Sequence, residues 1–164
     1  MILSIIMLLI SLLLEIVFNV FRGQFFFFIL SIIVIISKYK KDNRMYLALF
    51  ITGVLYDLFL TDLIFIHGII FMFLYYINNY LLNKKRNILL MLLVYFLNII
   101  IYSLFFILLG LITSNISIGL IIAILIRSIF INTIYFILMH YIYNVILRLI
   151  KNKDNNLSYK LNRW

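Results

Sequence analysis

The sequence contains no cysteine and no proline. The absence of cysteine excludes disulfide bonds, and the absence of proline removes the residue that most often kinks a helix. Alanine first appears at Ala48, so the small-residue cleavage site that follows a signal peptide is missing after the first apolar segment. The first segment also lacks a basic region before it. We therefore expect it to be a retained helix.

Motifs of the common enzyme classes are absent as well. The chain has no G-x-x-x-x-G-K-[ST] phosphate loop, no H-E-x-x-H metal-binding helix and no G-x-S-x-G nucleophile turn. His67 and His140 have no second histidine, cysteine or carboxylate at the spacing of metal ligands. The sequence thus predicts a protein that is not an enzyme and that has no catalytic residues, no cofactor and no metal.

Apolar residues dominate what is present. Hydrophobic residues make up 67% of the 164 residues, and the mean hydropathy is +1.23. Because no soluble single domain can hide so much apolar surface from water, the expected class is an integral membrane protein with one domain. The net charge of +9 is typical of nucleic-acid binding. However, the basic residues cluster in short loops and in the tail, as membrane topology requires, so no nucleic-acid partner is expected.

Six apolar segments are candidates for helices, since a membrane-spanning helix needs roughly 20 apolar residues. They are Met1–Val20, Phe25–Ser37, Met45–Leu60, Leu63–Leu82, Ile88–Ile112 and Ile116–Leu149. The predicted fold is an all-α polytopic membrane protein, a bundle of about six transmembrane helices. Residues 1–150 form the transmembrane domain in this prediction, and residues 151–164 form a short, basic, mobile cytoplasmic tail.

Two of the six segments have unusual lengths. Phe25–Ser37 is too short for a full crossing, so it must borrow flanking residues, thin the bilayer or lie partly buried in the protein. Ile116–Leu149 is too long for one straight crossing. It is either a tilted helix, or a break near Arg127 separates an interfacial piece from a final span, Ser128–Leu147.

The basic residues predict the orientation. Twelve of the 14 lie in loop two, in loop four and in the tail, namely Lys38, Lys40, Lys41, Arg44, Lys84, Lys85, Arg86, Arg148, Lys151, Lys153, Lys160 and Arg163. With six helices, these three regions fall on one side of the membrane, which the positive-inside rule makes the cytoplasm. Both termini are then cytoplasmic, and the basic tail with Trp164 is placed to contact anionic membrane lipids.

Three ionisable residues interrupt the apolar segments: Glu15, Asp57 and Arg127. A charge at the centre of a membrane helix costs about 2.5–3.5 kcal/mol on insertion scales. The topology places all three in the outer half of the membrane. One interpretation is a charge cluster in which Arg127 pairs with Asp57, Glu15 or both. In the other, each side chain reaches the outer interface by itself. The cluster is favoured for Asp57, and both interpretations stay open for the other two.

Small and amide side chains suggest how the helices pack. Gly53 lets a neighbouring backbone approach, or it is tolerated in its helix at a cost of about 1 kcal/mol. Asn132 is placed to hydrogen-bond across helices, or it faces a cavity or lipid headgroups.

The stretch Gly53-x-Leu55-x-Asp57-Leu58 resembles the third-helix signature of the MreD family of rod shape-determining membrane proteins. Ile66-His67-Gly68 is similar to the start of the next helix in that family, and Ser128–Asn132 with Tyr141 or Tyr143 is similar to the final helix. The chain departs from the family in three places. Phe59–Asp62 replaces a glycine-rich turn, Phe65 replaces a glycine two residues before the histidine, and Phe21–Gln24 replaces a proline-containing loop.

This resemblance implies a non-enzymatic scaffold subunit of the bacterial cell-elongation (rod) machinery in the plasma membrane. Such a subunit binds MreC and helps to couple MreB filaments to peptidoglycan synthesis and cell-shape control. Further implied partners are the rod-complex glycosyltransferase and a class B penicillin-binding protein, and a homodimer stays open. The residues that the resemblance assigns to helix packing or partner binding are Gly53, Leu55, Asp57, His67 and Asn132.

The family's fold resembles that of the substrate-binding subunits of energy-coupling-factor transporters, which gives a rival hypothesis. In that case the chain binds a vitamin or a metal from outside. Those subunits carry an Ala-x-x-x-Ala patch on the first helix, and Met1–Val20 contains no alanine. The sequence therefore favours the scaffold over the transporter subunit.

Overall fold

The computed structural model describes residues 2–22, 27–39, 42–60, 65–82, 87–113 and 118–161, which form six α-helices and no strand. The helices are α1 (Ile2–Arg22), α2 (Phe28–Tyr39), α3 (Arg44–Leu60), α4 (Ile66–Leu81), α5 (Ile88–Thr113) and α6 (Ile118–Leu161). Each helix corresponds to one of the six predicted apolar segments. The all-helical class is therefore confirmed.

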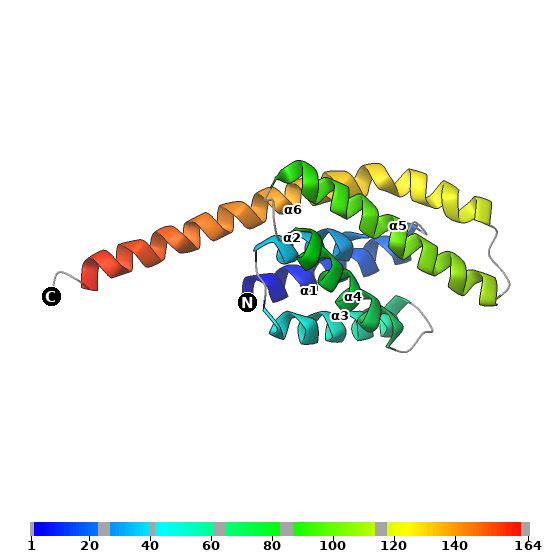
Figure 1. The fold of residues 1–164 in the computed structure, drawn as a ribbon, viewed down its shortest axis with the longest axis horizontal. Coiled ribbons are helices and arrows are strands. Elements are labelled where there is room, and N and C mark those ends of the chain that lie inside the picture. Colours follow the sequence, from blue (N-terminus) through cyan, green and yellow to red (C-terminus); the bar gives the residue numbers. More distant parts are fainter. Residues whose placement is uncertain are drawn as a thin grey trace.

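The helices alternate in direction and form a bundle around α2 (Figure 1). α2 contacts α1, α4, α5 and α6, and the most extensive contact of the bundle joins α3 to α4. The N-terminal ends of α1, α3 and α5 lie toward the same end of the bundle as the C-terminal ends of α2 and α4 (Figure 1). The helix ends that flank the two basic loops therefore share one end of the molecule.

Burial explains the short second helix. The ten residues from Phe28 to Ser37 are all buried. At 1.5 Å per residue, the 12 residues of α2 extend about 18 Å, well below the roughly 30 Å of a bilayer core. Of the three alternatives for this segment, the structure shows burial within the protein.

The outer surface of the other helices is strongly apolar. Among the described side chains, large exposed hydrophobic residues occur on α1, α3, α4, α5 and α6. Two stretches, Ile88–Phe105 and Ile129–Lys151, are long and apolar enough to cross a membrane. The two apolar stretches and the exposed apolar side chains on five helices together point to a membrane protein.

The last helix decides between the two alternatives for its segment and is longer than expected. α6 is continuous over 44 residues, about 66 Å at the rise of an α-helix, so the alternative break near Arg127 is wrong. The segment contains no proline that would interrupt the backbone hydrogen bonds. Residues 151–161, predicted as part of a mobile tail, continue α6, and its C-terminal part runs clear of the other helices (Figure 1).

Candidate functional site

Two glycines bring α3 and α4 into backbone contact. A Cβ atom built on Gly53 would lie 2.3 Å from the backbone nitrogen of Gly68 and 2.4 Å from its Cα atom. Distances under 3.0 Å are essentially never seen for real Cβ atoms, so no side chain fits at Gly53 without moving the α4 backbone. The close approach places the motif stretch of α3 directly against the start of α4.

At the next turn, Asp57 of α3 binds the first turn of α4. Its Oδ2 atom accepts a hydrogen bond from the backbone N–H of His67 at 3.1 Å, and its Oδ1 atom contacts Nδ1 of the His67 ring. His67 is the second residue of α4, where backbone N–H groups have no partner within their own helix. A carboxylate also interacts favourably with the positive end of a helix dipole. Asp57 is thus an N-terminal cap supplied by the neighbouring helix.

Glu15 and Asn132 cap α2 in the same way. The Glu15 Oε2 atom accepts the N–H of Ile29, the second residue of α2, at 2.9 Å. The Asn132 Oδ1 atom accepts the N–H of Phe27, just before α2, at 2.9 Å. Because α2 starts inside the protein, where water cannot satisfy these groups, its capping acceptors come from α1 and α6.

Two tyrosines connect the caps. The Tyr102 hydroxyl of α5 donates to the Tyr56 hydroxyl of α3 at 3.4 Å, and the Tyr56 side chain hydrogen-bonds Glu15. The ring centroid of Tyr56 lies 4.6 Å from that of His67, and the ring of Tyr102 lies 5.4 Å from that of Phe27. We call this connected group the polar core; it comprises Glu15, Tyr56, Asp57, His67, Tyr102 and Asn132.

The predicted site residues fall mostly inside the bundle. Glu15 and Asp57 are each 2% exposed, and Gly53, His67 and Asn132 are buried as well. Leu55 is half-buried and packs against the apolar core. Neither Glu15 nor Asp57 reaches the surface, so the interpretation in which each extends alone to the interface is wrong for both.

The predicted ion pair with Arg127 concerns a side chain that lies outside the described residues. What the structure does show is that both carboxylates bind backbone N–H groups at helix starts.

The sequence analysis missed the pairing of Asp57 with His67 and the roles of Tyr56 and Tyr102. A signal for the first was available, because Asp57 lies three residues before the end of α3 and His67 is the second residue of α4. A short connection makes two such helices antiparallel neighbours and brings those positions to the same level. Tyr102 carried no comparable signal among the 12 tyrosines of the chain.

Over the part of the chain that the structure describes, the protein is all-helical, two of its helices are long and apolar enough to cross a membrane, and a polar interior joins the helices. Within the described residues, no group of three or more histidine, cysteine, aspartate or glutamate side chains is placed to hold a metal ion. No protein-family model, curated protein or solved structure matches the chain.

Replacing Asp57 tests the cap of α4. Asp57→Asn keeps an oxygen acceptor but loses the negative charge at the helix start, so we expect the free energy of unfolding to fall by about 1–2 kcal/mol. The matched control is Asp42→Asn, because Asp42 caps α3 through the exposed N–H of Arg44 at 3.0 Å, where water replaces a lost bond. Reversible unfolding in mixed micelles measures both. Equal stability of Asp57→Asn and the wild type would remove this role from Asp57.

Proposed function

We propose that this chain is a multi-pass membrane protein whose six helices lie in the bacterial plasma membrane, with both termini in the cytoplasm. The exposed apolar surface supports a lipid environment. The shared position of the helix ends that flank the basic loops supports the orientation, because those charges then face one side (Figure 1).

We further propose that it acts as a non-enzymatic scaffold subunit of the MreD type. The observation that carries this proposal is that the two stretches that resemble the family meet each other in space. Gly53 packs on Gly68, and Asp57 binds His67, so each polar or small residue of one stretch has its counterpart in the other. The two stretches would meet in any pair of helices with so short a connection, so the support comes from the matched residue types, glycine against glycine and aspartate against histidine.

The conformation of Phe65 adds support at a place where the sequence departs from the family. Phe65 precedes α4 and has a φ of 65° and a ψ of −2°, in the left-handed region. Glycine is the residue that adopts this conformation at no steric cost, and the family has a glycine at this position. The backbone therefore keeps the turn that the family's glycine favours, although the residue differs.

In this proposal the protein works by helix recognition. The Asp57 cap and the glycine contact fasten α3 to α4, and the caps from Glu15 and Asn132 fasten the start of α2 to α1 and α6. A single-span partner of the MreC type binds the outside of this bundle. The polar core faces inward, so the partner meets other residues. Through that partner the protein helps to couple MreB filaments to the glycosyltransferase and the class B penicillin-binding protein of the rod complex.

Affinity capture from solubilised membranes tests the proposal. We expect the tagged protein to recover an MreC-type protein together with a penicillin-binding protein. Gly53→Val is expected to lose this capture and Gly119→Ala to retain it, because a Cβ atom at Gly119 meets nothing within 4 Å. Recovery of an ATPase pair with a coupling subunit would instead establish the transporter subunit and exclude the scaffold.

A further inference from the structure

Four fully buried side chains of α2, α5 and α6 carry polar atoms that bond to no other group in the described part of the protein. The four residues are Ser31, Tyr95, Asn98 and Asn132, and each is 0% exposed. The atoms are the hydroxyl oxygens of Ser31 and Tyr95, both polar atoms of the Asn98 amide, and Nδ2 of Asn132. Native proteins rarely leave buried polar groups without a partner, so several of them in one region need an explanation.

The packing of α5 on α6 brings the two asparagines to one level. The ring of Tyr95 stacks on the ring of Phe136, and the two centroids are 4.8 Å apart. Asn98 lies three residues after Tyr95, and Asn132 lies four residues before Phe136. Because α5 and α6 run in opposite directions (Figure 1), both asparagines lie about one turn from the stacked rings, toward the same end of the bundle.

The face of α5 that carries Asn98 turns toward α2. Tyr95, Asn98 and Tyr102 follow one another at spacings of three and four residues, so they share one face of α5. The ring of Tyr102 lies 5.4 Å from the ring of Phe27, just before α2. The hydroxyl of Tyr95 lies near that of Ser31, one turn further along α2. Asn98 lies between these two contacts, so α2, α5 and α6 all contribute to one polar region.

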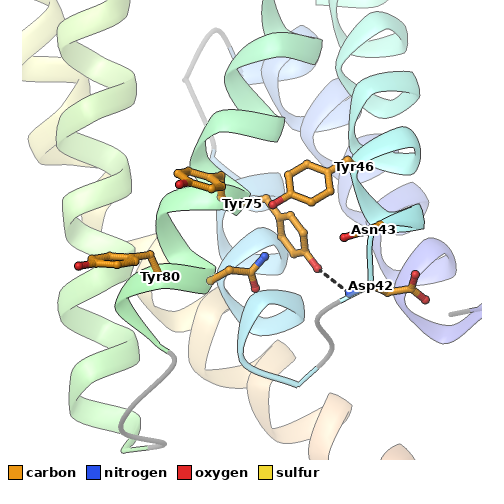
Figure 2. A pocket seen from close by; sticks show the side chains of 7 residues that line it. Asp42, Asn43, Tyr46, Tyr75 and Tyr80 are labelled. Carbon is orange, nitrogen blue, oxygen red and sulfur yellow. Dashed lines mark hydrogen bonds between the residues drawn. The ribbon is translucent and has the colours of Figure 1, made fainter.

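The two hydroxyls of this region face each other across a gap. Elsewhere in the bundle Tyr75 is also 0% exposed, and its hydroxyl accepts the N–H of Asp42 at 3.4 Å (Figure 2). The hydroxyls of Tyr95 and Ser31 are close enough to interact, yet no direct hydrogen bond joins them. Polar groups that face each other beyond the reach of a direct bond are commonly bridged by water.

The chemistry of the four side chains fits a small neutral ligand that both donates and accepts hydrogen bonds. The two amides supply Nδ2 donors, the Asn98 Oδ1 atom accepts, and the hydroxyls of Ser31 and Tyr95 do either. None of the four side chains carries a charge, which makes them a poor set of ligands for an ion. A buried water molecule needs two to four polar partners, and this region supplies that number.

We propose that water binds among Ser31, Tyr95, Asn98 and Asn132 and joins α5 to α2 and α6. The bound water accepts hydrogen bonds from the amide Nδ2 groups and donates to the Asn98 Oδ1 atom and to the hydroxyls. In the described part of the chain, the contacts of α5 with α4 and with α6 are the least extensive of the bundle. The water therefore holds a helix that direct packing attaches weakly. The site lies inside the bundle and does not depend on the scaffold role.

Solid-state NMR of the full chain in lipid bilayers tests the contact with water, through magnetisation transfer from water protons. We expect transfer to the Nδ2 groups of both Asn98 and Asn132, although neither side chain reaches the surface. The backbone N–H of Ile36 is the control and should receive none, because Ile36 is 0% exposed and lies within α2, where its N–H is bonded to its own helix. A missing transfer at either amide overturns the inference.

Asn98→Leu gives a second test, in which the two explanations predict opposite signs. If water satisfies the amide, the leucine leaves the water and Asn132 short of partners, so the unfolding equilibrium constant in mixed micelles should rise about tenfold. If the amide has no partner at all, its removal should lower that constant. An unfolding constant for Asn98→Leu at or below that of the wild type therefore contradicts the proposal. The NMR measurement uses the wild type and stands even if this variant fails to fold.

Ser103→Ala is the matched control on α5. Ser103 is 7% exposed, and its hydroxyl donates to the carbonyl oxygen of Ile99 in its own helix at 2.5 Å. Its removal takes a buried polar group from α5 without disturbing the proposed water, so the unfolding constant should change about twofold or less. An equal rise for Ser103→Ala and Asn98→Leu would show that any polar group on α5 has this effect, which excludes a specific role for the water.

Discussion

Gly53→Val is expected to destabilise the protein more than any other single replacement on α3. The added Cβ atom would lie 2.3 Å from the Gly68 nitrogen and 2.5 Å from the carbonyl carbon of His67. These are backbone atoms, which cannot turn aside as a flexible side chain can. The two helices must therefore separate, and the contacts that bind Asp57 to α4 weaken with them. We expect the free energy of unfolding to fall by about 3 kcal/mol, the upper part of the range for an overpacked interior.

Gly119→Ala is the matched control for this prediction. Gly119 is exposed on α6, and a Cβ atom there has no neighbour within 4 Å. Alanine is favoured over glycine inside a helix by about 1 kcal/mol, so this variant should be as stable as the wild type or slightly more stable. Both are measured by reversible unfolding in mixed micelles. If Gly53→Val and Gly119→Ala have the same stability, the close contact between α3 and α4 does not exist.

Glu15→Leu is expected to cause the second large loss. The leucine fills a similar space but leaves the N–H of Ile29 without its acceptor inside the protein, and it removes the hydrogen-bond partner of Tyr56. The backbone N–H of Phe28 also loses its bond to Glu15, so three buried donors are affected. A buried donor without a partner costs about 1–3 kcal/mol, so we expect a loss of at least about 3 kcal/mol. Glu15→Gln keeps an acceptor oxygen and should lose less than half as much.

A double-mutant cycle locates this effect at the start of α2. Asn132→Leu removes the acceptor of the Phe27 N–H, which lies two residues before the N–H that Glu15 binds. Residues that share one helix start couple, so the double variant should lose less than the sum of the two single losses. Unfolding of all four proteins in mixed micelles gives the coupling. Strict additivity would show that Glu15 and Asn132 act at independent places.

The sequence predicted the helices well because each is a continuous apolar segment bounded by charged or polar residues. Those segments needed no information about packing, and their ends agree with the structure to within a few residues for α3, α4 and α5. The end of α6 was missed because polarity was taken as a sign of a mobile tail. A helix that continues a long apolar helix needs no new nucleation, so a polar extension is tolerated without an apolar face.

Four of the six residues of the polar core were singled out from the sequence, but the contacts between them were not predicted. Glu15, Asp57, His67 and Asn132 stand out in the sequence because polar residues are expensive in an apolar segment. However, the hydrogen-bond partners of these side chains are mostly backbone N–H groups. Every residue of the chain has such a group, so the sequence does not indicate which one is the partner. The sequence analysis considered only a charged partner, Arg127, and did not consider that the start of a neighbouring helix supplies a compensating positive potential as well.

The cap from Asn132 also sets an order of events during synthesis. Phe27 and Asn132 are 105 residues apart, so the start of α2 stays without this acceptor until α6 has been made. Glu15, by contrast, precedes α2 in the chain and is available as soon as α2 emerges. A chain that ends before α6 therefore keeps an unsatisfied N–H in its interior and leaves one side of α2 uncovered. A capped and fully covered start of α2 thus distinguishes a chain that includes α6 from one that ends before it.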